Sequence, residues 1–265
     1  MDCQSPRFRH SDFEIWISFV IRASDFGFSR GRLDSRSVNS AEGIIVLDKP
    51  ERLSSARAVA RVKRLLEKGT KIGHAGTLDP FATGVLLLLV GKATRQCEAL
   101  MDGQKVYEAT VKLGANTDTD DPESAEIVRE NVVRPSDQQI RDAIDKFVGV
   151  ISQRPPKFSA MKIGGRRAYK LAREGKAVEI PPRNVHVDAI EMLEIAWPLV
   201  KIRVVCGRGT YIRAIARDLG ELLNTGGYLT ELRRTRIGEY DLSQAVTLEQ
   251  LAVEGVERHL IALTP

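Results

Sequence analysis

The residues from Gly73 to Gly84 are Gly-His-Ala-Gly-Thr-Leu-Asp-Pro-Phe-Ala-Thr-Gly. Three glycines within these twelve residues, and a proline directly after Asp79, predict a tight loop between a helix and a buried strand. Such a loop lets the backbone approach a ligand closely. The residues alone leave two interpretations open. Asp79 either forms an Asp-Pro turn or supplies a functional carboxylate, and His74 is either an ordinary polar loop residue or a ligand contact.

Regular elements are predicted on both sides of this loop. The apolar run from Gly43 to Pro50 ends at a proline and predicts a buried strand. Ser54 or Ser55 then caps a helix that we expect to end at Gly69. Its apolar face comprises Val59, Val62, Leu65 and Leu66. The residues from Gly84 to Val90 predict a second buried strand.

The middle of the chain predicts an antiparallel sheet. Apolar and mostly polar residues alternate from Lys105 to Leu113, which is typical of a strand with one exposed face. The segments Val185–Ile195 and Leu199–Cys206 resemble two strands of an antiparallel pair.

Two further helices are predicted. One follows Ser136, which forms a capping box with Gln139, and its apolar face comprises Ile140, Ala143, Ile144, Phe147 and Val148. The other runs from Tyr211 to Leu223 and should bury Ile212, Ile215, Leu219 and Leu222. Because strands and helices are mixed without an alternating βαβ order, the sequence predicts an α+β fold with a mixed, mostly antiparallel sheet flanked by helices.

Composition excludes several classes of protein. With 43% hydrophobic residues in 265, the chain is not disordered throughout. The longest apolar run, Val85–Val90, is far shorter than the roughly 20 residues that a membrane span needs. Cys3, Cys97 and Cys206 form no Cys-x-x-Cys pair, which argues against a disulfide framework and a zinc site. We therefore expect a soluble, cytoplasmic protein.

Charge is unevenly distributed along the chain. Residues 48–95 contain 10 basic and 4 acidic residues, and residues 154–217 contain 14 and 5. Residues 96–153 carry 6 basic and 12 acidic residues. Two basic blocks can fold into one positive surface that suits a nucleic acid, although ordinary solvated faces explain the same pattern.

The segment Gly207-Arg-Gly-Thr-Tyr-Ile-Arg213 ends a strand and opens a helix. It places Arg213 in the first helical turn, where the helix dipole disfavours a cation. Such an arginine serves a carboxylate or phosphate elsewhere, or is a solvated surface residue. Familiar cofactor motifs fail. Residues 84–92 depart from the P-loop pattern, the four histidines lack metal-ligand spacing, and there is no Gly-x-Ser-x-Gly motif.

Six segments in order resemble the TruB family of tRNA pseudouridine synthases. They are Gly43–Pro50, Gly73–Gly84, Lys105–Tyr107, Leu113–Asp120, Gly209–Arg213 and Leu232–Arg234. The resemblance implies a pseudouridine synthase fold with the active-site cleft across the sheet, in a catalytic domain of residues 41–251. It further implies an enzyme that isomerises uridine-55 in the TΨC loop of tRNA to pseudouridine without a cofactor. Separately, we expect a monomer with no metal and no membrane partner.

The resemblance also implies the residues of the site. Asp79 corresponds to the catalytic aspartate and Arg213 to the arginine paired with it. Tyr107 corresponds to the tyrosine that packs on the target base and is implicated in removing the C5 proton. The other substrate-binding positions are Leu232 as an apolar wall, His74 near the everted nucleotide, Lys49 as support for the pocket, and Tyr211. Arg166, Arg167 and Lys170 are candidates for phosphate contacts.

The residue types suit this chemistry. The N1–C1′ bond of uridine must break, the base must turn, and C5 must bond to C1′, so neither redox change nor group donor is required. Asp79 acts as a nucleophile on the sugar or base, or as a base at C2′, and the sequence leaves these routes open. Arg213 counters the rise in carboxylate pKa that desolvation causes. A binding and folding protein for tRNA with little catalysis, and a generic basic RNA-binding protein, are the alternatives.

Two regions depart from the family pattern. Residues 1–40 have no recognised counterpart, and we expect a disordered extension. Bacterial members usually carry a PUA RNA-binding domain near the C-terminus, whereas 14 residues follow Leu251 here. We therefore expect residues 252–265 to form a short tail without that domain, and tRNA binding to be weaker and more salt-sensitive than in a relative that has it.

Overall fold

The computed structural model describes residues 41–159, 162–163, 166–167 and 180–262. The chain divides into two units, Met1–Val38 and Asn39–Pro265, and the described residues all lie in the second. The predicted extension over residues 1–40 and the candidate phosphate contact Lys170 therefore lie outside the described residues. In the described part of the chain, no helix has the length and apolar character needed to cross a membrane.

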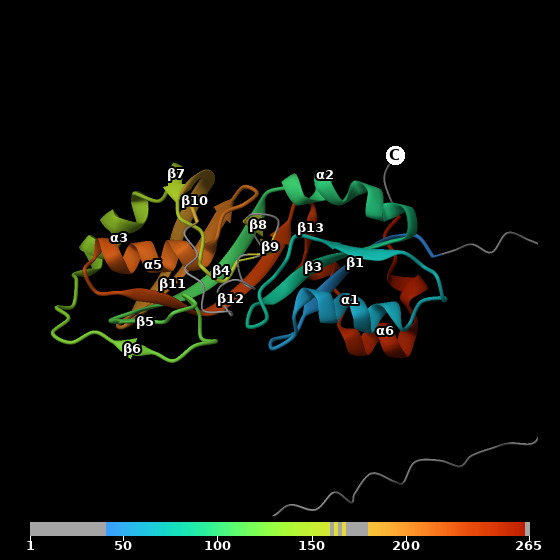
Figure 1. Cartoon of the computed structure of the whole chain (residues 1–265), viewed down its shortest axis with the longest axis horizontal. Coiled ribbons are helices and arrows are strands. Elements are labelled where there is room, and N and C mark those ends of the chain that lie inside the picture. The colour runs from blue at the N-terminus through green and yellow to red at the C-terminus, as the bar shows by residue number, and fades with distance from the viewer. Residues whose placement is uncertain (1–40, 160–161, 164–165, 168–179, 263–265) are drawn as a thin grey trace, which may run out of the picture. The chain divides into compact units, whose positions relative to one another are not determined.

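A nine-stranded mixed sheet forms the centre of the molecule (Figure 1). Its strands are β1 (Gly43–Lys49), β2 (Ile72–Ala75), β3 (Thr83–Val90), β4 (Lys105–Leu113), β7 (Gly149–Gln153), β10 (Arg183–Ala196), β11 (Leu199–Cys206), β12 (Gly227–Ile237) and β13 (Tyr240–Asp241). The main order is β1-β3-β12-β4-β11-β10-β7, with β2 paired to β3 and β13 to β12. Among these strands only β3 and β12 pair in parallel, which confirms the predicted α+β fold with a mostly antiparallel sheet.

Two short two-stranded sheets accompany this sheet in the described residues. One pairs β5 (Ala115–Asn116) with β6 (Ile127–Val128), and the other pairs β8 (Lys162–Ile163) with β9 (Arg166–Arg167). The candidate phosphate contacts Arg166 and Arg167 thus form strand β9.

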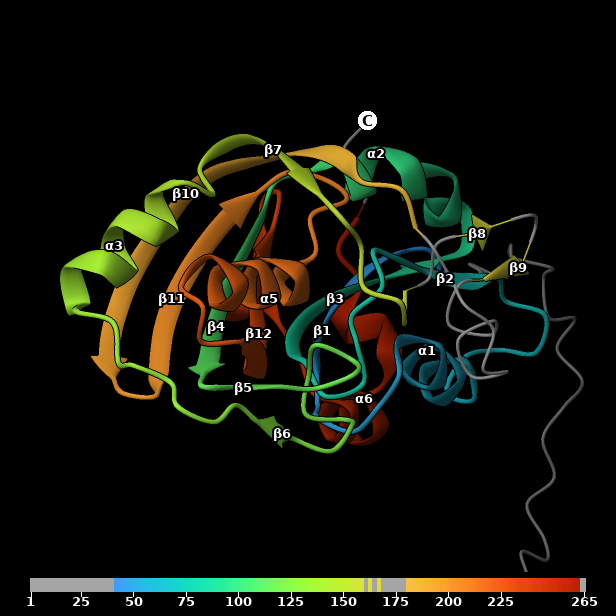
Figure 2. The ribbon, with the colours of Figure 1, turned by 60° about the vertical axis from the view of Figure 1, so that its left-hand side comes forward.

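Helices cover the sheet in three places. The α-helices are α1 (Ser55–Lys63), α2 (Cys97–Asp102), α3 (Asp137–Asp145), α5 (Ile212–Leu222) and α6 (Leu248–Glu254). Three short 3-10 helices are η1 (Gly91–Gln96), η2 (Leu242–Gln244) and η3 (Val256–His259). Helix α5 lies across β4 and β12 with α3 beside it (Figure 2), whereas α1 and α6 lie together against β1 and β3 (Figure 1).

Each group of helices buries its own apolar core. Beneath α3 and α5 the core includes Val111 of β4, Ile202 of β11 and Ile215 of α5. Strands β1 and β3 are buried on both faces, because α1 and α6 cover one face and α2 packs on the other. This double coverage explains why the sequences of β1 and β3 are continuous apolar runs, whereas β4 alternates.

Gly84 is required where β12 passes closest to β3. Its φ is +97°, and a Cβ atom at this position would lie 2.2 Å from the carbonyl oxygen of Arg234. The parallel pairing of Arg234 with Gly84 depends on this approach. The glycine therefore allows β12 to pair with the start of β3, directly after the Asp79 loop.

Several local predictions were wrong. Helix α1 ends at Lys63 instead of Gly69, because a series of i→i−3 hydrogen bonds follows, and this leaves Leu65 41% exposed. Val148 and Leu222 were predicted on apolar helix faces but are exposed, because α3 already ends at Asp145, before Val148, and Leu222 is the last residue of α5. Residues 73–75 are part of strand β2 and not of a loop, since β2 pairs with β3.

The residues after Leu251 continue the same body. The predicted domain boundary at Leu251 falls inside α6, which extends to Glu254. Val256 is buried, and Ile261 exchanges two backbone hydrogen bonds with Ile44 of β1. Residues up to 262 thus belong to the same body as β1.

Candidate active site

One cavity at the middle of the sheet brings together five of the seven predicted site residues. Asp79 lies in the loop between β2 and β3, Tyr107 on β4, Leu232 on β12, Arg213 in the first turn of α5, and Tyr211 at its N-cap. All five line a cavity of about 340 Å³. That volume is within the range of small-molecule sites and can admit one nucleoside.

Arg213 joins the predicted catalytic carboxylate to a second one. Its Nε lies 3.0 Å from Oδ2 of Asp79, and its Nη2 donates a hydrogen bond to Oδ1 at 3.2 Å. Its Nη1 donates to Oδ2 of Asp121 at 3.1 Å. Since the Arg213 side chain is only 4% exposed, it is not a solvated surface arginine. A planar guanidinium held by several acceptors fixes the orientation of the carboxylate it contacts.

Backbone carbonyls hold Arg213 from two further directions. Nη1 donates to the carbonyl oxygen of Thr119 at 2.9 Å, and Nη2 donates to that of Phe158 at 3.0 Å. The two Nη groups of Arg213 therefore donate to acceptors from three segments of the chain. This network explains why an arginine is placed in the first turn of α5, against the helix dipole.

Asp121 was not predicted as a site residue. Its side chain is 2% exposed, and burial raises the pKa of its carboxyl, while the Thr119 hydroxyl and the Arg213 guanidinium oppose that rise. The hydroxyl of Thr119 and the backbone N–H of Glu123 donate to its Oδ1 at 2.5 and 2.9 Å. Asp121 directly follows the Leu113–Asp120 segment, but its contact with Arg213 spans 92 residues and has no local signal.

Two residues from the first strand and helix hold the Asp79 loop from beneath. Lys49 is fully buried and donates to the carbonyl oxygens of Pro50, Leu53 and Pro80 at 2.8, 2.7 and 3.2 Å. Burial lowers the pKa of its ammonium to about 8, and the negative charge of Asp79 limits that fall. Lys49 does not line the cavity, and its role as support for the pocket stays a prediction.

Ser55 makes the second attachment. Its hydroxyl donates to the carbonyl oxygen of Leu78 at 2.8 Å and accepts from the N–H of Leu78 at 2.9 Å. These reciprocal bonds fix the residue directly before Asp79. Helix α1 thus begins at the residue that positions the loop.

Tyr107 packs against an arginine that the sequence did not single out. The guanidinium carbon of Arg234 lies 6.0 Å from the centre of the Tyr107 ring. Arg234 is 1% exposed and donates to the carbonyl oxygens of Val85 and Gly76 at 2.8 and 3.0 Å. Burial raises the pKa of Tyr107, and the charge of Arg234 opposes the rise. Tyr107 is therefore a neutral phenol near pH 7.

Tyr211 is held through its backbone. The side-chain amide of Gln153 accepts from the N–H of Tyr211 at 2.8 Å and donates to its carbonyl oxygen at 3.1 Å. On the ring side, the guanidinium carbon of Arg183 lies 5.3 Å from the centre of the ring. Both partners fix the ring at the cavity wall.

His74 lies apart from the residues that line the cavity. It is a residue of β2, paired with Leu88 of β3, and its carbonyl oxygen accepts from the thiol of Cys97 at 3.5 Å. Of the predicted site residues, His74 and Lys49 are thus the two that do not reach the cavity.

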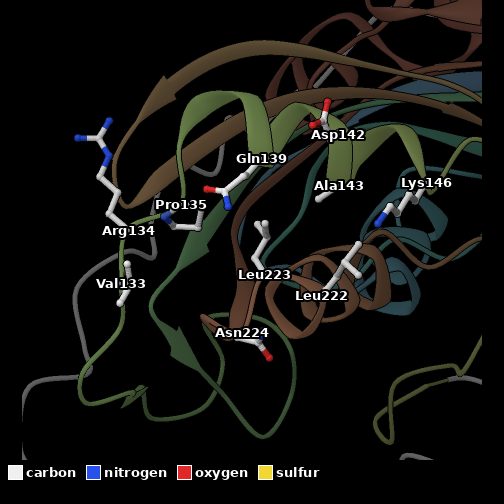
Figure 3. A pocket seen from close by; sticks show the side chains of 10 residues that line it. All are labelled: Val133, Arg134, Pro135, Gln139, Asp142, Ala143, Lys146, Leu222, Leu223 and Asn224. Atoms are coloured by element: carbon white, nitrogen blue, oxygen red, sulfur yellow. The ribbon is translucent and has the colours of Figure 1, made fainter.

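A separate hollow of about 490 Å³ lies between α3 and the end of α5 (Figure 3). Gln139 and Ala143 of α3 face Leu222 and Leu223 across it. None of the predicted site residues lines this hollow, and it shares no residue with the Asp79 cavity. It is therefore not the candidate active site.

Solved structures share this fold. A chain in the crystal structure of a Cbf5–Nop10–Gar1 complex is 33% identical, with a TM-score of 0.62 over 82% of this chain and 57% of that chain. A chain in the structure of an H/ACA RNP bound to a substrate RNA is 31% identical, with a TM-score of 0.59 over 82% and 56%. This chain thus spans little more than half the length of those neighbours. The fold is that of the pseudouridine synthases.

Sequence comparisons define the family within that class. Residues 63–212 match the N-terminal domain of the TruB family pseudouridylate synthases, and residues 213–259 match the tRNA pseudouridylate synthase B C-terminal domain. The chain belongs to the TruB family, as the sequence motifs predicted, and is a pseudouridine synthase.

Curated relatives agree with this assignment. The tRNA pseudouridine synthase B of Aromatoleum aromaticum is 46% identical over 84% of this chain and 72% of its own length. That of Sinorhizobium medicae is 45% identical over 81% and 69%.

Proposed function

We propose that the chain converts uridine-55 in the TΨC loop of tRNA into pseudouridine. The observation that carries the proposal is the contact of both Asp79 oxygens with the buried Arg213, at the wall of a cavity that Tyr107 also lines. The tRNA substrate is supported by the names of the curated relatives, tRNA pseudouridine synthase B.

The reaction is an isomerisation that needs one well-placed carboxylate. The N1–C1′ bond breaks, the detached uracil turns, and C5 bonds to C1′; the proton on C5 leaves and N1 gains one, so atoms and electrons balance. Asp79 acts either on C1′ or the base as a nucleophile, or at C2′ as a base. Its contact with the Arg213 guanidinium holds both carboxylate oxygens in a fixed orientation at the cavity wall, which both routes need.

The other cavity residues act on the flipped base. A uridine in a folded RNA loop must leave its stack, at a cost of a few kcal/mol that contacts in the pocket offset. The ring of Tyr107 and the side chain of Leu232 supply apolar faces for the uracil. As a neutral phenol, Tyr107 can also donate a hydrogen bond to the edge of the base.

Release of tritium from C5-labelled uridine in tRNA tests this proposal. We expect Asp79→Asn to lower turnover by at least about 10³-fold while tRNA binding is largely retained. Asp188→Asn, which changes an exposed aspartate on β10, is the matched control and should leave turnover unchanged. Undiminished activity of Asp79→Asn would contradict the assignment. A native chain that binds tRNA without turnover would support the tRNA-binding and folding alternative.

A further inference from the structure

The cavity wall carries far more positive than negative charge. Among the described residues that line it, Asp79 is the one carboxylate, whereas five residues are cationic: Lys105, Arg183, Arg208, Arg213 and Arg234. Because the substrate is a nucleotide within an RNA chain, each of these cations is a candidate phosphate ligand unless a partner already neutralises or buries it.

Carboxylates already neutralise two of the five cations. Arg213 contacts Asp79 and Asp121. Arg208, at the rim, contacts Glu98 and Asp102 at 2.9 and 2.8 Å. A phosphate approaching either arginine would meet a carboxylate in the same place.

Two more cations are buried and turned to the backbone. Arg234 is 1% exposed and donates to two carbonyl oxygens beneath Tyr107. Lys105 is 6% exposed and its ammonium donates to the carbonyl oxygen of Met101. Burial lowers the pKa of Lys105, and the nearby charge of Arg234 lowers it further, so neither group is placed to approach a backbone phosphate.

Arg183 differs from the other four. It contacts no carboxylate in the described part of the chain; its Nη2 donates to the carbonyl oxygen of Gly209, and its guanidinium lies over the ring of Tyr211. Its Nε is buried and has no hydrogen-bond partner among the described residues. The stacking on Tyr211 orients the planar fork before a ligand arrives, which reduces the conformational entropy that binding costs.

We propose that Arg183, fixed by Tyr211, binds a phosphodiester that flanks the everted uridine. The inference rests on the proposed function. It assigns the uracil to the side of the cavity with Asp79 and Tyr107, and the RNA backbone to the side with Gly209 and Arg183. Placing the phosphate away from Asp79 also avoids repulsion between two anions inside one cavity. An arginine fork suits a phosphate because it can donate two parallel hydrogen bonds.

A double-perturbation cycle tests the proposal. The substrate is an RNA stem-loop of the TΨC arm, prepared with a neutral methylphosphonate on the 5′ or on the 3′ side of the target uridine. Initial rates of pseudouridine formation are measured for the native chain and for Arg183→Gln. We expect Arg183→Gln alone, and the methylphosphonate at one of the two positions alone, each to lower kcat/KM by about 10- to 100-fold, as loss of a hydrogen bond to a charged group does. At that position, Arg183→Gln and the methylphosphonate together should lower kcat/KM no further than either one alone.

Arg208→Gln is the matched control, since it removes the same charge from the same cavity. Its effect should multiply with that of each methylphosphonate, because Arg208 is already paired with Glu98 and Asp102. Melting temperatures of both variants should stay close to that of the native chain. Independent, multiplying effects of Arg183→Gln and the methylphosphonate at both positions would overturn the proposal.

The outcome is separable from that of the proposed function. If the native chain binds the stem-loop without turning it over, the same cycle is measured on the dissociation constant. Coupling between Arg183 and one phosphate then still supports the site, and additivity at both positions still rejects it.

Discussion

The guanidinium of Arg213 contacts both carboxylate oxygens of Asp79, at 3.0 Å from Nε to Oδ2 and 3.2 Å from Nη2 to Oδ1. Asp79 is the more exposed partner, with 32% of its side chain accessible against 4% for Arg213. The arginine is thus the fixed member, held by Asp121 and by two carbonyl oxygens, and Asp79 is the member that faces the cavity.

Arg213→Lys tests this arrangement while keeping the positive charge. A lysine cannot contact both oxygens of Asp79 and also reach Asp121, so we expect kcat to fall by about 100-fold, the scale of a misplaced catalytic group. Single-turnover formation of pseudouridine measures the effect, with tRNA affinity changing much less. A native rate in this variant would show that charge alone, and not the fork, is required.

Ser55→Ala tests the attachment of the loop before Asp79. The change removes both hydrogen bonds to Leu78 and leaves its buried N–H and carbonyl unpaired, which should lower the free energy of unfolding by about 1–3 kcal/mol. We also expect kcat to fall because Leu78 adjoins Asp79.

Ser54→Ala is the control for this variant. Ser54 is the N-cap of the same helix, and its hydroxyl accepts from the N–H of Arg57 at 3.3 Å. Losing that cap should cost about 1 kcal/mol of stability without changing kcat. Equal effects of the two changes on kcat, after correction for the folded fraction, would contradict a positioning role for Ser55.

The sequence predicts those parts of the site whose signals are local. The capping box of Ser136 is present in α3 as predicted, and β10 and β11 pair antiparallel as predicted. The misfit of Arg213 with its helix dipole left two interpretations open, an anionic partner elsewhere or a solvated surface residue, and the contacts with Asp79 and Asp121 support the first. The family resemblance then identified that partner as Asp79, which is 134 residues away from Arg213 in the sequence.

What the sequence did not predict depends on contacts between distant segments. Strand β12 was missed because it carries four charged residues, one of which, Arg234, is buried through hydrogen bonds to the carbonyl oxygens of Val85 and Gly76, far from it in the sequence. Asp121 and Arg183 were missed for the same reason, because their contacts are with distant residues: Asp121 with Arg213, and Arg183 with Gly209 and Tyr211. No periodicity or spacing can report such partners, since the sheet order alone brings them together.

The acid dependence of stability is expected to include Asp120. Burial raises the pKa of its carboxyl to about 6, although its contact with Arg217 opposes the rise. In the unfolded chain the carboxyl has its ordinary pKa near 3.8, so between about pH 4 and 6 the folded chain holds a proton that the unfolded chain has lost. This group therefore favours folding at low pH, and its contribution falls as pH rises towards 6.

Thermal unfolding between pH 4 and 7 checks the sign. Relative to the native chain, Asp120→Asn should gain stability as pH rises from 4 to 6, by about 3 kcal/mol for a shift of about two pH units. Asp118→Asn, which changes an exposed neighbour, should run parallel to the native chain. A constant difference between Asp120→Asn and the native chain would exclude this linkage.

Gly84→Ala tests whether close strand contact holds the cavity together. The new Cβ atom would lie 2.2 Å from the carbonyl oxygen of Arg234, so β12 must move away from β3. Because β12 carries both Leu232 and Arg234 to the cavity, the Gly84→Ala variant should be less stable than the native chain and should also have a lower kcat.

Gly69→Ala separates the clash from backbone strain. Gly69 has the same φ of +97° but no atom within 4 Å of an added Cβ. That control should lose only the roughly 1–2 kcal/mol of a left-handed non-glycine residue. Thermal melting of the two variants, with tritium release for each, measures the difference. Equal losses of stability would show that the backbone conformation of Gly84, and not its contact with Arg234, is what requires glycine.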